Sequence, residues 1–149
     1  MARFVFRAEV ALTFRRQQEQ AATRTWIEAK AALERARAAH AEAQHAVASA
    51  LYEAQDVHDP GQRVWHRHWI VRLQQQLGQR QARVAEAQPP VDAAAARMNA
   101  ARRDVKALER LRARALADWQ LVQQREEQKE MDWLGSVKYA LRMTGRDQS

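Results

Sequence analysis

The sequence predicts an all-α protein, a long antiparallel two-helix coiled-coil hairpin whose second helix is longer than the first. Apolar residues recur at alternating steps of three and four along most of the 149 residues, a spacing that keeps one helix face against a partner. Only 4 glycines and 3 prolines are present, which is too few for the turns of a many-stranded sheet. We therefore expect one hairpin domain over residues 1–149.

The first helix is predicted over about residues 3–56. Alternating steps of three and four residues from Val5 give sixteen positions, and only three of them, Arg15, Glu19 and His40, are polar. Alanine takes every seventh position from Ala22 to Ala50, so the partner helix should approach closely. The visited positions are Val5, Ala8, Leu12, Arg15, Glu19, Ala22, Trp26, Ala29, Leu33, Ala36, His40, Ala43, Val47, Ala50, Ala54 and Val57.

A bend is predicted at residues 57–61, where Asp59, Pro60 and Gly61 follow one another. Proline disrupts a preceding helix, but it fits the first position of a new one, where its missing N–H costs nothing. The Asp59 carboxylate is then placed to cap the first turn of the second helix.

The second helix is predicted over about residues 62–142. The stepping there visits Ile70, Leu73, Leu77, Arg80, Val84, Ala87, Val91, Ala94, Met98, Ala101, Val105, Leu108, Arg112, Ala115, Trp119, Val122, Glu126, Lys129 and Trp133. Pro89-Pro90 lies inside this stretch, and each proline removes a helix hydrogen bond. Because the stepping keeps its phase across the pair, we expect one kinked helix. The alternative is a break that starts the third helix of a bundle.

The two predicted helices differ in length. If the bend is centred near residue 59, the numbers of facing residues sum to about 118, and the first helix ends opposite Arg112 and Ala115. The second helix continues to Trp133 without a partner. An exposed apolar stripe usually marks an interface, and the members of this one are Leu116, Trp119, Val122, Met131 and Trp133.

The composition argues against catalysis. The chain has no cysteine and none of the glycine-rich loops that hold phosphates. His66 and His68 are two residues apart and therefore project from nearly opposite sides of a helix, so we predict neither a metal site nor a cofactor nor an enzyme. No apolar run resembles a signal peptide or a membrane span, and we expect a cytoplasmic protein. A net charge of +7 suits acidic partners.

Two surfaces are candidates for binding. Trp65 and Trp69 lie one helical turn apart, with Leu73 a turn further and Tyr52 across the bend; they either cover the open end of the hairpin or form a docking patch. A basic run is either a solvated helix face or a shaft seated among acidic groups. It comprises Arg97, Arg102, Arg103, Lys106, Arg110, Arg112 and Arg114, with Arg3, Arg7, Arg15 and Arg16 alongside.

The chain resembles the flagellar export protein FliJ family of small helical hairpins. The resemblance lies in three places along most of the chain: Phe4-Val5-Phe6-Arg7-Ala8-Glu9 with Leu12, Arg15 and Glu19; Trp69-Ile70 with Leu73; and Leu108-Glu109-Arg110-Leu111 with Glu126-Glu127-Gln128-Lys129 and Met131-Asp132. Two positions depart from the family pattern. Pro89-Pro90 interrupts a helix that the family usually keeps continuous, and Trp133 stands where the family often has glutamate.

The resemblance implies a stalk-like protein that binds the hexameric flagellar export ATPase and links it to the membrane export gate and to export chaperones. Contacts with the ATPase ring would then fall on Arg3, Arg7, Arg110, Arg114, Trp119, Val122 and Trp133. Contacts with the export gate would fall on Tyr52, Trp69 and Leu73. The protein would lie at the cytoplasmic face of the membrane through its partners, without inserting into it.

Three alternatives stay open. The equivalent stalk of a virulence type III secretion system would have the same features. A basic coiled coil could bind nucleic acid, but acidic residues interrupt the arginine run and no aromatics alternate with it, so we expect no nucleic-acid partner. A structural homodimer could form if the unpaired stripe packed against its own copy.

Overall fold

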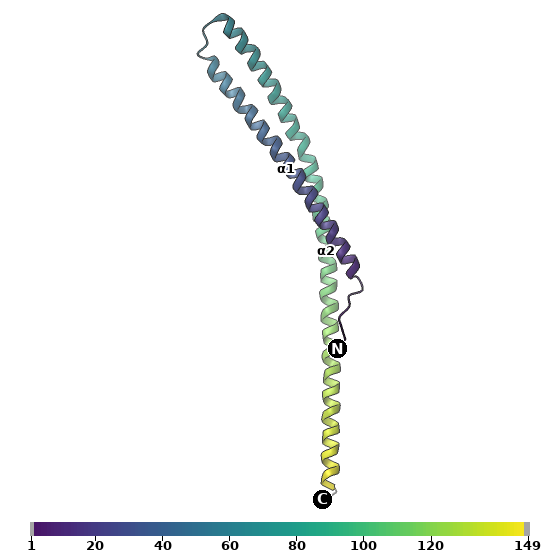
Figure 1. Ribbon diagram of the computed structural model, residues 1–149. Helices are drawn as coiled ribbons and strands as arrows, with labels where there is room; N and C mark the ends of the chain where they lie inside the picture. The colour runs from purple at the N-terminus through teal and green to yellow at the C-terminus, as the bar shows by residue number, and fades with distance from the viewer. Residues whose placement is uncertain (1, 148–149) are drawn as a thin grey trace. The chain divides into compact units, whose positions relative to one another are not determined.

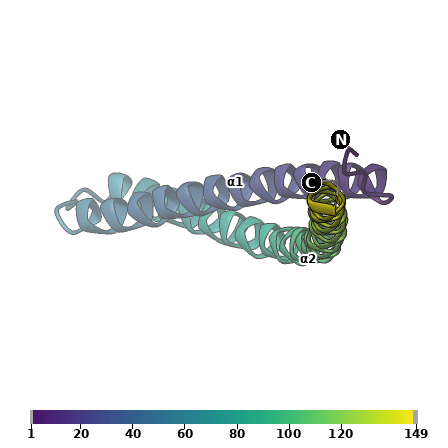
Figure 2. The same ribbon diagram turned by 90° about the horizontal axis from the view of Figure 1, so that it is seen from below.

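The computed structural model describes residues 2–147, which form two helices, α1 (Glu9–Ala54) and α2 (Pro60–Asp147) (Figure 1). The described residues contain no strand. Figures 1 and 2 both show α1 lying beside the first part of α2. The predicted all-α hairpin is confirmed, and α2, with 88 residues, is longer than α1, with 46.

The chain divides into two compact units, and both helices run through both units. One unit is Arg15–Arg103, which contains the bend. The other combines Met1–Phe14 with Asp104–Ser149 and carries both ends of the chain. We call the first the bend unit and the second the terminal unit.

The apolar core follows the predicted stepping. Among residues 2–146, every buried apolar residue lies on one of the two predicted stripes. In the terminal unit these residues are Leu12 and Val105, and in the bend unit they are Leu33, Ala43, Ala50, Leu73, Ala94 and Met98. Three of the eight are alanines, as expected for helices that approach closely.

Polar contacts between the helices fix the pairing of residues. In the bend unit, Arg102 Nε lies 3.7 Å from Glu19 Oε1, and Arg80 Nη1 donates a 2.9 Å hydrogen bond to the Ala39 carbonyl. The numbers of these pairs sum to 121 and 119. Both values are close to the predicted sum of about 118, whereas the 3.4 Å hydrogen bond from Arg37 Nη2 to Gln88 Oε1 joins two long side chains whose numbers sum to 125.

The start of the first helix was predicted six residues too early, because α1 begins at Glu9 rather than near Arg3. Residues 2–6 have no regular secondary structure. Aromatic and β-branched residues such as Phe4, Val5 and Phe6 lose side-chain freedom in a helix. In this segment Phe4 and Phe6 are half-buried while Arg3 and Val5 are exposed, the alternation of an extended chain. Arg7 and Ala8 then form a turn that leads into α1, closed by a 3.1 Å hydrogen bond from the Glu9 N–H to the Phe6 carbonyl. Val5, predicted to lie in the core stripe, is therefore exposed.

The bend has the predicted chemistry. Helix α1 ends at Ala54, and α2 begins at Pro60, one residue after its cap. The Gln62 backbone N–H donates to Asp59 Oδ2 at 3.4 Å. Arg63 Nε donates a 3.0 Å hydrogen bond to the Val57 carbonyl, which ties the connecting segment to the first turn of α2.

Helix α2 passes through Pro89 and Pro90 without a break, so the three-helix alternative is wrong. The two prolines leave the carbonyls of Ala85 and Glu86 without their helical N–H donors. Both of these residues and both prolines are exposed, so water can satisfy the carbonyls. The interruption therefore falls on the solvent face of α2, away from the core stripe.

Candidate interaction surfaces

The terminal unit holds an N-terminal segment that packs on α2. The Phe4 ring lies 5.9 Å from the Trp119 ring, and the Arg112 guanidinium lies 5.6 Å from the centre of the Phe4 ring. An extended backbone lets Phe4 reach further along α2 than a helix of the same length. Trp119 is consequently half-buried, and the chain itself covers part of a residue that was predicted to contact a partner ring.

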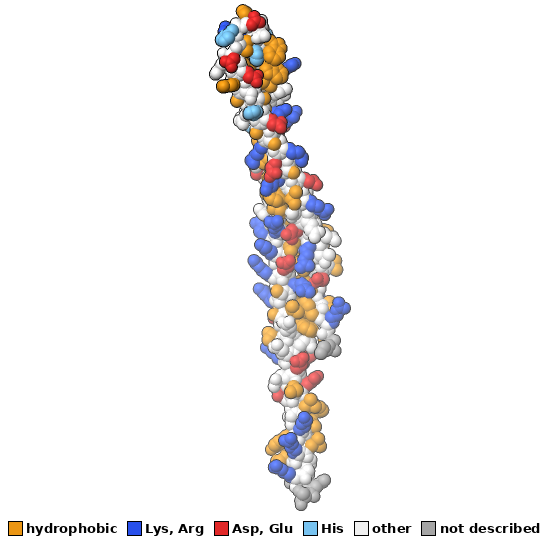
Figure 3. Space-filling view, turned by 60° about the vertical axis from the view of Figure 1, so that its left-hand side comes forward, with side chains coloured by type: hydrophobic (Ala, Val, Ile, Leu, Met, Phe, Trp, Pro, Cys, Tyr) orange, Lys and Arg blue, Asp and Glu red, His pale blue; other side chains and the backbone are white. Residues whose placement is uncertain are grey.

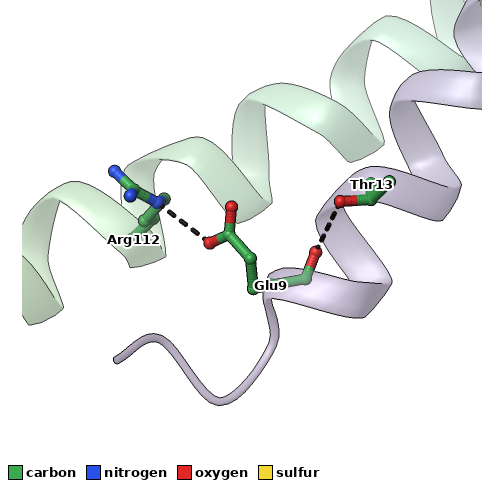
Figure 4. A network of polar contacts seen from close by, with 3 residues as sticks. All are labelled: Glu9, Thr13 and Arg112. Atoms are coloured by element: carbon green, nitrogen blue, oxygen red, sulfur yellow. Dashed lines mark hydrogen bonds and ion pairs between the residues drawn. The ribbon is translucent and has the colours of Figure 1, made fainter. Parts of the chain in front are cut away.

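A short polar network holds the start of α1 to α2 (Figure 4). Arg112 Nε donates to Glu9 Oε2 at 3.0 Å, and Thr13 Oγ1 donates to the Glu9 carbonyl at 3.0 Å. The charged side chains are 40% and 48% exposed, so the ion pair contributes at most about 1 kcal/mol. The ion pair instead positions the Arg112 guanidinium, which also contacts the Phe4 ring.

The other predicted ring-contact residues are exposed. Arg3, Arg7, Arg110 and Arg114 all lie at the surface of the terminal unit. Past Trp119, α2 carries apolar side chains that nothing in the described chain covers, and Trp133 is 65% exposed. Figure 1 shows α2 continuing past the N-terminal segment, and Figure 3 shows hydrophobic side chains at the surface of this part.

More apolar residues are exposed on α2 past Trp119 than the sequence interpretation proposed. Besides Val122, Met131 and Trp133, the exposed apolar residues of the tail include Leu121, Leu134, Tyr139, Leu141 and Met143. Stepping on by four and three from Trp133 reaches Val137 and Ala140, so the predicted periodicity does not find the further exposed residues, which lie around the helix rather than on one stripe. We call residues 120–147 the tail.

The bend unit carries an aromatic surface on the first turns of α2. The Trp65 and Trp69 rings stack at 6.0 Å with an angle of 11° between their planes. Tyr52, on α1, is also exposed. Leu73, also predicted to contact the gate, is only 7% exposed, because its position on the core stripe buries it against α1, and it offers a partner little surface. Trp65 takes its place in the exposed surface.

A groove lies beside this aromatic surface, where the last turn of α1 and the connecting segment meet α2. Its volume is about 470 Å³, a size that suits a bulky apolar group. Ala54, Val57, Ile70 and Val71 line it, and Arg67 is among the cations at its edge. Predicted core residues Val57 and Ile70 are only half-buried here, so the chain does not fill this end of its own core.

No helix among residues 2–147 is long and apolar enough to cross a membrane. Within the same residues, no three histidine or acidic side chains are grouped closely enough to hold a metal ion.

Comparison with known proteins adds no assignment, since no family model, curated protein or solved structure matches the chain.

Proposed function

We propose that the chain is a non-catalytic central-stalk and chaperone-escort component of the flagellar type III export apparatus. It binds the hexameric export ATPase ring and links it to the membrane export gate. The observation that carries the proposal is that the tail of α2 extends past the N-terminal segment without a covering helix. Val122 and Trp133 are exposed there. An exposed apolar stripe on a helix indicates a partner that covers it.

The terminal unit is the part that enters the ring in this proposal. Its exposed arginines, Arg3, Arg7, Arg110 and Arg114, supply positive charge for acidic groups on the ring. An asymmetric hairpin contacts each of six identical subunits differently and so biases their nucleotide states differently. The chain would act mechanically, without making or breaking a bond.

The bend unit is the part that faces the export gate in this proposal. Its contact surface is Trp65, Trp69 and Tyr52, and the buried Leu73 lies one helical turn beyond Trp69 on α2. Tryptophan is enriched among residues that dominate binding energy. The protein is then held at the cytoplasmic face of the membrane by its partners, and its export chaperones use the same exposed surfaces.

The experiment is an ATPase assay with the purified export ATPase, alone and with the full chain. The full chain should raise ATP turnover, and a chain truncated after Arg114, which lacks Trp119 and the tail, should not. In the full-length chain, Trp133→Ser should reduce the effect, while the matched variant Trp65→Ser at the bend should leave it intact. Equal turnover with the full and truncated chains would refute the proposal.

Genomic context separates the flagellar assignment from the equivalent virulence stalk. Neighbouring genes for flagellar export support the first, and neighbouring genes for an injectisome support the second.

A further inference from the structure

The groove at the bend and the tail carry complementary patterns on the same helix α2. The first pattern lies on one face of α2 at the edge and floor of the groove: Arg63, Arg67, Ile70, Val71 and Gln74. These residues have the spacing i, i+4, i+7, i+8 and i+11, which defines one side of a helix. The face is therefore basic in its first two positions and apolar in the next two.

The second pattern has the same spacing 63 residues later: Glu126, Glu130, Trp133, Leu134 and Val137. Trp133 is 65% exposed, and both glutamates are exposed. This face is acidic in its first two positions and apolar in the next three. Because 63 is a multiple of seven, the offset preserves the phase of the coiled-coil repeat.

We propose that the tail of a second copy of this chain packs in the groove at the bend, parallel to α2 and offset by 63 residues. In this register Arg63 faces Glu126, Arg67 faces Glu130, and the apolar pair Ile70 and Val71 faces Trp133 and Leu134. The inference does not depend on the proposed function.

The charges of the two surfaces favour the tail of a second copy as the segment that binds in the groove. No aspartate or glutamate occurs in α2 from Pro60 to Ala85, so the wall that α2 gives the groove presents only positive or neutral side chains. Residues 125–132 of the tail hold four acidic residues, Glu126, Glu127, Glu130 and Asp132, against Arg125 and Lys129, and the cations Lys138, Arg142 and Arg146 lie further along it. Opposite charges steer the two surfaces together and fix their register.

Shape also fits this register. Leu141 faces Gly78, and nothing lies within 4 Å of the place where a Cβ would stand on that glycine. A large side chain therefore meets an open position on the other helix. Residues 124–143 would lie along 61–80, a contact roughly 30 Å long.

The contact joins two different surfaces, so each copy keeps one free groove and one free tail. Such head-to-tail contacts form open chains unless the rotation closes them into a ring. A contact of this size belongs to the weak class of interfaces, and we expect self-association at roughly micromolar concentrations.

Sedimentation velocity of the full chain over a concentration series tests the proposal. The wild type should grow beyond the dimer as concentration rises. Arg67→Glu and Glu130→Arg should each weaken the association by about tenfold or more. Arg83→Glu makes the same charge change at an exposed position on α2 outside the groove, and it should leave the association nearly unchanged.

Mixing the two weakened variants gives the sharper result. The Arg67→Glu tail fits the unchanged groove of the Glu130→Arg chain, and the Glu130→Arg tail meets the Arg67→Glu groove with both charges swapped. Both contacts then form, so the mixture should recover growth as chains in which the two variants alternate. The double variant, which swaps both charges, should recover growth. A wild type that stays monomeric up to about 1 mM, an equal loss in Arg83→Glu, or a mixture that associates no more strongly than either variant alone would each overturn the proposal.

Discussion

Replacing Leu12 by alanine should destabilise the start of α1 by about 2–3 kcal/mol. Leu12 has 0% exposure and is the largest fully buried side chain among the described residues. The substitution removes three carbon atoms, which at ~0.8 kcal/mol per buried methylene gives ~2.4 kcal/mol. A cavity would add to this in a thick core. The core here is two helices wide, so neighbours and water can close around the gap.

Hydrogen exchange of the backbone amides from Leu12 to Gln20 measures this loss, because these amides exchange when the start of α1 opens. Their exchange should accelerate by about 30- to 140-fold, the factor that corresponds to 2–3 kcal/mol. The matched control is Leu111→Ala, since Leu111 is 51% exposed in the same unit, and it should accelerate exchange much less. An acceleration below about threefold for Leu12→Ala, or an equal effect of Leu111→Ala, would refute the reasoning.

Three further substitutions test other features of the fold. Phe4→Ala should shift the NMR resonance of the Trp119 indole N–H, because the ring 5.9 Å away is lost. Replacing both Pro89 and Pro90 by alanine should raise the free energy of unfolding by about 1–3 kcal/mol in a urea titration, since two helix hydrogen bonds return. Asp59→Ala should lower the free energy of unfolding by about 0.5–1 kcal/mol, because it removes the side chain that caps the first turn of α2.

The substitutions Phe4→Ala and Asp59→Ala each have a matched control. Phe14→Ala removes an aromatic ring that is 54% exposed, and it should leave the Trp119 resonance in place; movement of that resonance would argue against the Phe4 contact. Asp56→Ala removes a carboxylate that precedes the cap, and it should leave stability nearly unchanged. For the prolines, an unchanged or lower unfolding free energy would mean that water fully compensates the exposed carbonyls.

The sequence predicted where the core lies because each helix of a two-helix hairpin has one face toward its partner. All eight apolar residues that are buried among the described residues lie on the predicted spacing, Leu12 and Val105 among them. The spacing does not predict the degree of burial, since most of the predicted positions are only half-buried. The bend was predictable for a different reason, since Asp59 and Pro60 suit the cap and the first position of a helix and suit few other places.

The start of α1 could not be predicted from spacing. Phe4 and Phe6 are spaced as in an extended chain, and Ala8 and Leu12 are spaced as in a helix. The sequence therefore carries both spacings close together, on either side of the turn at Arg7 and Ala8. The contact of Phe4 with Trp119 decides between them, and it joins residues 115 positions apart. Leu73 illustrates a related limit, because a resemblance to a family assigns a residue to a surface without regard to burial in this chain.

The tail can stay helical without a partner because it continues a helix that already exists. An isolated helix of this length is marginal in water, since forming its first turn is unfavourable. In α2 that turn lies far upstream, and each residue of the tail only adds one hydrogen bond to a formed helix. Side chains support it locally: Gln128 Nε2 donates to Asp132 Oδ1 at 3.0 Å, and Ser136 Oγ donates to the Asp132 carbonyl at 2.9 Å. A partner therefore meets a stripe already ordered for binding, which lowers the entropy lost on association.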